Sequence, residues 1–184
     1  KYGTDKPDLR NPIEIKDVTH IMKMDDVKLD IFKKLISKGA LVKAIAAPNT
    51  FKKTRSFFDN LNSWAKEEGA SGLAYISFEK KEGKIYGTGP IAKFFSEKSI
   101  NAIISECSLS DKDSVFFSCD KKNNVEKIAG LARQKIATEL NLIDHDKFSF
   151  CWITDFPMYQ FNEEEKKIDF SHNPFSMPQI DMQE

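Results

Sequence analysis

The 184-residue sequence contains none of the short catalytic motifs that spacing alone can identify. It has no G-x-G-x-x-G string, no Walker-type phosphate loop, no H-E-x-x-H pair and no G-x-S-x-G elbow. Its three histidines stand far apart, at positions 20, 145 and 172, and predict no metal cluster. We therefore assign no catalytic and no metal-ligating residue from these patterns.

Cysteine is scarce, and long apolar runs are missing. Cys107, Cys119 and Cys151 form an odd set without a C-x-x-C pair. This spacing predicts free thiols in a reducing cytoplasm, and it argues against a disulfide framework or a zinc site. Lys43 interrupts even the apolar run of residues 41–47, so no segment approaches the length of a membrane span and no membrane partner is expected.

Net charge is also absent, since 28 basic residues balance 28 acidic ones. The balance conceals a stretch, residues 31–58, that has seven Lys or Arg and no Asp or Glu. Such a stretch can attract a phosphate backbone, because each neutralised phosphate releases counterions. Lys52, Lys53 and Arg55 stand just before an expected helix, whose amino end adds to the positive field. The alternative is that these residues are ordinary solvent-exposed side chains of a helix and a loop, with no ligand.

Hydrophobic periodicity predicts a mixture of strands and helices. Strands are expected at 13–18, 40–46, 73–79, 84–88, 113–120 and 148–152, helices at 29–36, 57–65, 99–105 and 124–140, and a hairpin from 158–161 and 168–170. The apolar stripe of the last helix leaves Lys127, Arg133, Lys135 and Glu139 facing outward. No regular βαβ period occurs, which favours an α+β fold with an antiparallel sheet covered by helices. A doubly wound parallel sheet is the alternative.

His172 and Asn173 stand side by side in a loop braced by Pro174 and Pro178. An imidazole and a carboxamide held this way can bind a carboxylate, an amino group or a phosphate with little loss of ordering entropy. The alternative is a turn whose polar side chains cap their own backbone. These residues leave both interpretations open.

Several strings together resemble bacterial-type aspartyl-tRNA synthetase, a class II synthetase. The longest is YGTDKPDLR at residues 2–10, which is similar to the family's YGSDKPDLR. The others follow in the family's order, at residues 69–75, 89–94, 113–117, 152–157 and 172–178. The resemblance covers essentially the whole chain. With no initiator Met and no domain-ending signal, the sequence is expected to be a fragment of a longer chain.

The resemblance implies three segments. Residues 13–146 would be the insertion module called the GAD domain, a two-layer α+β sandwich that the amidotransferase B subunit shares. Residues 1–12 and 147–184 would be flanks of the catalytic core. The parent would condense aspartate with ATP, with magnesium assisting, and transfer aspartate to tRNA-Asp. Whether it also charges tRNA-Asn stays open, and the family is a homodimer.

The resemblance also assigns roles to individual residues. His172 matches the first residue of the family's HHPF loop, which closes over aspartate and adenylate, and Asn173 replaces its second histidine. The candidate tRNA-facing residues are Lys43, Lys52, Lys53, Arg55 and Lys93. The arginines of the second and third class II motifs fall outside the sequence, so the fragment alone should be inactive and bind no cofactor. Alternatives are an amidotransferase B-subunit module and a stand-alone α+β binding domain.

Overall fold

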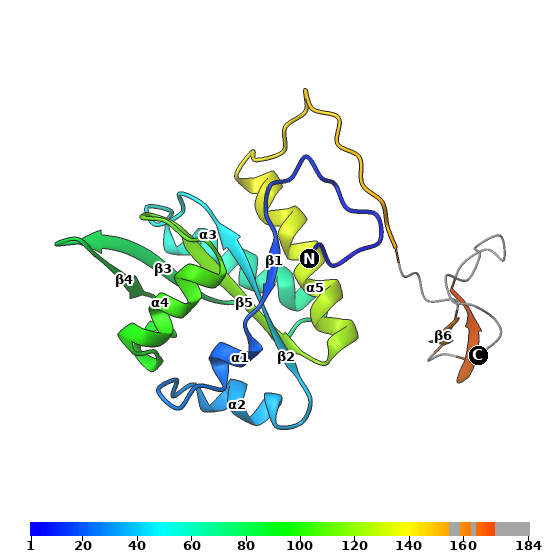
Figure 1. Ribbon diagram of the computed structural model, residues 1–184, viewed down its shortest axis with the longest axis horizontal. Helices are drawn as coiled ribbons and strands as arrows, with labels where there is room; N and C mark the ends of the chain where they lie inside the picture. Colours follow the sequence, from blue (N-terminus) through cyan, green and yellow to red (C-terminus); the bar gives the residue numbers. More distant parts are fainter. Residues whose placement is uncertain (155–158, 163–164, 172–184) are drawn as a thin grey trace. The chain divides into compact units, whose positions relative to one another are not determined.

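The computed structural model describes residues 1–154, 159–162 and 165–171. The chain forms two compact units, Lys1–Ser149 and Phe150–Glu184, which are described separately. The first unit contains a five-stranded antiparallel sheet (Figure 1). Its strands, in spatial order, are β1 (Ile15–Asp17), β2 (Leu41–Ala47), β5 (Ser114–Asp120), β3 (Ala74–Lys81) and β4 (Lys84–Thr88). The α+β class and the antiparallel sheet are confirmed, and the parallel alternative is wrong.

Helices cover both faces of this sheet (Figure 1). One face carries α1 (Thr19–Met22), α2 (Asp30–Ile36) and α4 (Glu97–Glu106), preceded by the 3-10 helix η1 (Ala92–Phe94). The opposite face carries α3 (Arg55–Glu67) and α5 (Lys122–Glu139). The arrangement therefore has three layers, one more than the expected sandwich.

The central strand explains the additional layer. In β5, Phe117 packs with the α1, α2 and α4 side, whereas Phe116 packs with the α3 and α5 side. Both phenylalanines are fully buried. A strand that buries consecutive large side chains needs an apolar layer on each face, because successive side chains point to opposite sides of the sheet.

The β3–β4 hairpin is also as predicted, with a tighter turn. Only Glu82 and Gly83 separate the two strands, and both have positive φ, 49° and 83°. Two consecutive positive φ values match the type I′ turn, whose twist suits an antiparallel hairpin. Glycine is the residue that adopts this conformation with the least strain.

Arg133 departs from the expected outward orientation. It lies on α5 with only 2% of its surface exposed. Its guanidinium donates hydrogen bonds to the backbone carbonyls of Asp8, Asn11 and Ile13, and it stacks over the Tyr2 ring, 4.9 Å from the centroid. Burial lowers the pKa of Arg133, while the charges of Tyr2 and Asp8 oppose that shift. The first 13 residues therefore cover the outer face of α5, which the helix pattern alone could not reveal.

The second unit contains a two-stranded hairpin of β6 (Tyr159–Asn162) and β7 (Lys167–Phe170), as predicted. The strand expected at 148–152 is not formed, and Phe148, Phe150 and Trp152 are at least 90% exposed. A strand needs a hydrogen-bonding neighbour, and the described residues offer none to this segment.

Among the described residues, every helix is too short or too polar to cross a bilayer. The three cysteines are free thiols, as expected. Burial raises the pKa of Cys107 to about 12 and that of Cys119 to about 11, whereas Cys151 is exposed. The two buried thiols therefore stay protonated near neutral pH.

Candidate nucleic-acid interface

The turn that joins β2 to α3 concentrates exposed positive charge on the first unit. Lys52, Lys53 and Arg55 are all exposed there, and we call these three residues the basic turn. Within the described part of the chain, neither lysine has a carboxylate within ion-pair distance. Arg55 pairs with the exposed Asp59 carboxylate, at 3.5 Å. Such a weak surface contact leaves the arginine charge available to another anion.

The polypeptide around the basic turn is held in place by buried and partly buried hydrogen bonds. The Asp113 carboxylate accepts from the backbone N–H of Asn49 at 3.0 Å and from that of Ser110 at 2.7 Å. Thr50, which is fully buried, donates its hydroxyl to the Ala47 carbonyl at 2.7 Å. The turn is thus rigid before any ligand arrives, which lowers the entropy lost on binding.

Aromatic rings support two lysines near the turn. Lys53 Nζ lies 5.6 Å from the Phe57 ring centroid, and Lys112 Nζ lies 4.9 Å from that of Phe51. A cation over a ring face gains electrostatic attraction and has less rotational freedom. Lys112 was missed at the sequence level, because only the fold places it beside the turn. Its charge is shared with Glu79 at 3.0 Å, so Lys112 contributes less free positive charge than the basic turn.

The other two lysines of the predicted set lie elsewhere. Lys43 is on β2 and pairs with Asp17 of the neighbouring strand, Nζ to Oδ2 3.1 Å, with 16% of its side chain exposed. Lys93 is exposed on η1, which contacts β4 and bonds through Phe94 O to the Lys28 N–H. The structure therefore brings together Lys52, Lys53 and Arg55, and it separates Lys43 and Lys93 from them.

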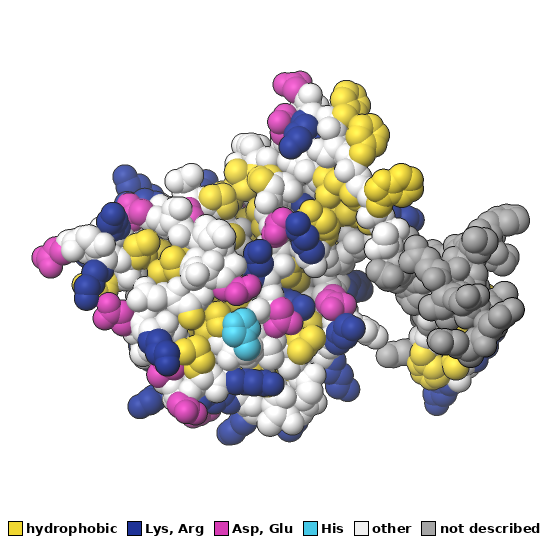
Figure 2. All heavy atoms as spheres, in the orientation of Figure 1, with side chains coloured by type: hydrophobic (Ala, Val, Ile, Leu, Met, Phe, Trp, Pro, Cys, Tyr) yellow, Lys and Arg dark blue, Asp and Glu magenta, His cyan; other side chains and the backbone are white. Residues whose placement is uncertain are grey.

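Charges of both signs are mixed over the face shown in Figure 2, where Lys and Arg side chains alternate with Asp and Glu. His172 and Asn173, the other predicted site residues, lie outside the described residues. No group of three or more His, Cys, Asp or Glu within the described ranges could hold a metal ion.

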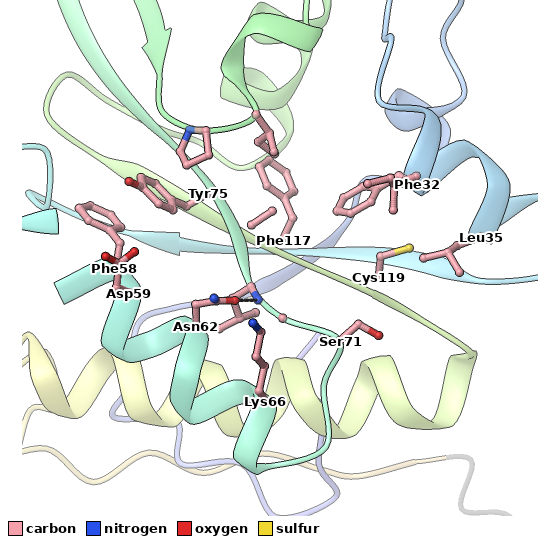
Figure 3. A pocket seen from close by; sticks show the side chains of 16 residues that line it. Phe32, Leu35, Phe58, Asp59, Asn62, Lys66, Ser71, Tyr75, Phe117 and Cys119 are labelled. Carbon is pink, nitrogen blue, oxygen red and sulfur yellow. Dashed lines mark hydrogen bonds between the residues drawn. The ribbon is translucent and has the colours of Figure 1, made fainter. Parts of the chain in front are cut away.

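Beside the basic turn, helix α3 forms one wall of a pocket of about 350 Å³ (Figure 3). Phe32 of α2, Tyr75 of β3 and Phe117 of β5 contribute aromatic rings, and Asn62 and Lys66 of α3 contribute polar groups. This pocket was not predicted from the sequence. The one local signal is the spacing of Arg55, Asp59, Asn62 and Lys66, which places four polar residues on one face of a helix.

The fold and this interface define an α+β domain with a rigid electropositive turn next to an aromatic pocket. Residues 32–129 match the GAD domain, and the chain belongs to this family. That assignment was expected from the sequence and is confirmed.

Comparison with curated proteins identifies longer relatives. The chain is 54% identical over all 184 residues to the "Aspartate--tRNA(Asp/Asn) ligase" of Pelagibacter ubique, covering 31% of that protein. The protein of the same name from Methylocella silvestris is 51% identical over 100% of this chain and 30% of its own length. The one from Rickettsia canadensis is 52% identical over 97% of this chain and 29% of its own length. The chain thus spans about 30% of the length of these curated relatives.

Proposed function

We propose that this chain is the GAD insertion module, with adjoining catalytic-core segments, of an aspartate–tRNA ligase. The alignment of the entire chain with such ligases, at 54% identity to one of them, carries the proposal. An amidotransferase module would share the GAD domain but not the flanking strings at residues 2–10 and 172–178. The proposed division is 1–12, 13–146 and 147–184, with the middle segment as the insertion.

The parent enzyme would use aspartate, ATP and magnesium, work as a homodimer in the cytoplasm and charge tRNA. The names of the relatives include both tRNA-Asp and tRNA-Asn, which makes both candidate substrates. We place His172 and Asn173 at the aspartate and adenylate site. The exposed aromatic side chains at 148, 150 and 152 support a flank that packs against the remainder of the parent, because exposed apolar clusters of this kind mark contact surfaces.

A chimera tests this proposal. The 184 residues replace the aligned segment of the Pelagibacter ubique ligase, and aspartate attachment to tRNA-Asp and tRNA-Asn is measured. We expect activity within about tenfold of the unaltered ligase, because half of the residues are identical. His172→Ala in the chimera should raise the KM for aspartate while leaving the KM for tRNA unchanged.

Two controls frame the chimera experiment. The same ligase with the segment deleted should be inactive, and the isolated 184-residue chain should show no aspartate-dependent exchange between ATP and pyrophosphate. A correctly folded chimera that charges neither tRNA would contradict the assignment. Exchange by the isolated chain would show that the fragment carries an active site of its own.

Within the parent, the basic turn is proposed to face tRNA. Changing Lys52, Lys53 and Arg55 together to Ala should reduce the slope of log affinity against log salt by about 2 to 3, because each phosphate contact contributes about 0.7 to 0.9. The measurement is tRNA binding by the chimera at several salt concentrations.

The matched control removes three exposed lysines, Lys6, Lys23 and Lys127. None of the three belongs to the basic turn or lines the pocket beside α3. We expect its salt slope to match that of the unaltered chimera. Equal slopes for both triple variants would remove the basic turn from the interface.

A further inference from the structure

We propose that the pocket between α2 and α3 binds an unpaired nucleobase of RNA. The base would stack among the aromatic side chains, its polar edge would meet Asn62 and Asp59, and Lys66 would contact the adjoining phosphate. This inference rests on the proposed RNA-facing role of the unit and adds a site to it. The pocket residues Phe32, Asn62, Lys66 and Tyr75 were not among the predicted tRNA-facing residues.

The pocket lies where β5 extends beyond the start of its neighbour β3. The β3–β5 ladder ends at the pair Ala74 and Phe117, whereas β5 continues to Asp120 alongside β2. Beyond Phe117, the β3 side of β5 therefore has no strand partner. Cys119 lines the notch that results, with α2 from one face of the sheet and α3 from the other as its borders. An unpartnered strand edge exposes backbone donors and acceptors to a ligand.

The lining suits a flat aromatic ligand. Phe32, Tyr75 and Phe117 surround the cavity (Figure 3). Phe58 stacks on Tyr75 at 4.1 Å between ring centroids and 15° between planes, which fixes the orientation of the tyrosine ring. The volume of about 350 Å³ lies at the small end of the range for ligand pockets. Every base presents π faces, so stacking on aromatic side chains is the usual way in which proteins hold unpaired bases.

The polar side of the pocket has a defined hydrogen-bonding pattern. Asn62 Oδ1 accepts from the Leu73 N–H at 2.9 Å (Figure 3), which leaves its amide nitrogen as a donor. A Cβ at Gly72 would lie 2.8 Å from this Oδ1, so a larger residue there would displace the Asn62 side chain and disturb the bond. Asp59 supplies an acceptor. Burial, and then the charge of Asp59, raises the pKa of Tyr75, so the phenol keeps its proton and is a second donor.

Charge links the pocket to the basic turn. Arg55, Asp59, Asn62 and Lys66 follow one another at spacings of four, three and four along one face of α3. Lys66 has no carboxylate within ion-pair distance among the residues described. A phosphate chain that enters at the basic turn can thus follow this face to the pocket. A purely apolar ligand would use neither the cations Arg55 and Lys66 nor the acceptor Asp59 and the donor Asn62 between them.

The test compares binding with and without bases. The chain is titrated with a fluorescently labelled single-stranded RNA octamer of mixed sequence and with an octamer of the same backbone that has no bases. We expect the base-bearing RNA to bind at least about tenfold more tightly, as one stacked base provides. The triple alanine variant of the basic turn should weaken both ligands by the same factor.

Two variants address the pocket itself. Ser71→Phe places a ring at the mouth of the pocket from an exposed loop position, and Phe32→Leu removes one aromatic face while keeping an apolar side chain. Each should reduce the preference for base-bearing RNA at least about fivefold. Ser105→Phe, at an exposed position on α4 that is not part of the pocket, is the matched control and should keep the full preference.

The outcomes separate the two proposals. If the unaltered chain binds both octamers equally and more weakly at higher salt, the pocket does not bind a base. The proposal that the basic turn faces RNA would then be retained. If it binds neither octamer at low salt, both are wrong. Loss of preference in Ser105→Phe as well as in Ser71→Phe would also overturn the pocket assignment. Thermal unfolding of each variant verifies that it is folded.

Discussion

Replacing Arg133 with methionine should lower the free energy of unfolding by about 3 to 5 kcal/mol. Methionine retains much of the side-chain volume but donates no hydrogen bond. The carbonyls of Asp8, Asn11 and Ile13 would then lose their charged donor in a buried environment. A hydrogen bond to a charged group contributes about 1.5 to 3 kcal/mol, and three are removed together.

Urea unfolding of the chain measures this effect, with Arg10→Met as the matched control. Arg10 is a partly exposed arginine whose guanidinium pairs with the Asp8 carboxylate at 2.9 Å. Surface pairs of this kind contribute about 1 kcal/mol or less, so the control should remain close to the unaltered chain. Similar losses in the free energy of unfolding for both variants would mean that the buried hydrogen bonds of Arg133 contribute no more than an exposed ion pair.

Replacing Gly130 with alanine should destabilise the chain by about 1 to 3 kcal/mol. Within a helix this change is ordinarily stabilising by about 0.5 to 1 kcal/mol, because glycine loses more backbone entropy. Here a Cβ would lie 2.7 Å from the Gly3 carbonyl oxygen and 3.0 Å from its carbon. These are backbone atoms, so the N-terminal segment has to move away from α5.

A double-mutant cycle isolates the clash. Deleting residues 1–5 removes Gly3, and in that shortened background Gly130→Ala should be neutral or stabilising. Urea unfolding of the four proteins gives the coupling between the two changes. Equal destabilisation in both backgrounds would contradict the proposed contact and indicate that the alanine disturbs α5 by another route.

The sequence was informative wherever a local period dominated. The helix expected at 57–65 is α3, and the one expected at 124–140 is α5 with its apolar stripe buried as predicted. The hairpin that ends with the strand at 84–88 formed because glycine in its turn suits the twist of paired strands. The segment at 148–152 shows the limit of this approach, because alternation alone does not form a strand without a neighbour to bond.

The candidate interface was only partly accessible from the sequence. Lys52, Lys53 and Arg55 could be grouped from the sequence, because residues so close along the chain are also close in space. The sequence could not show that Lys43 lies apart from them, because its ion pair with Asp17 is set by the neighbouring strand. Lys112 approaches Phe51 from a distant part of the chain, which no local pattern reports.

The α+β class, the family, the acid-free stretch and most of the elements followed from the sequence, because each depends on local order or on matching strings. Helix α1 was not expected, and the strand expected at 148–152 is not formed. Three features depend on the tertiary fold: both faces of the sheet are covered, Arg133 is buried under the N-terminal segment, and a notch opens beside β5. The register between strands and the path of a segment across a helix depend on contacts between residues far apart in the chain. Local periodicity contains no information about which distant carbonyl meets a guanidinium or where a neighbouring strand begins.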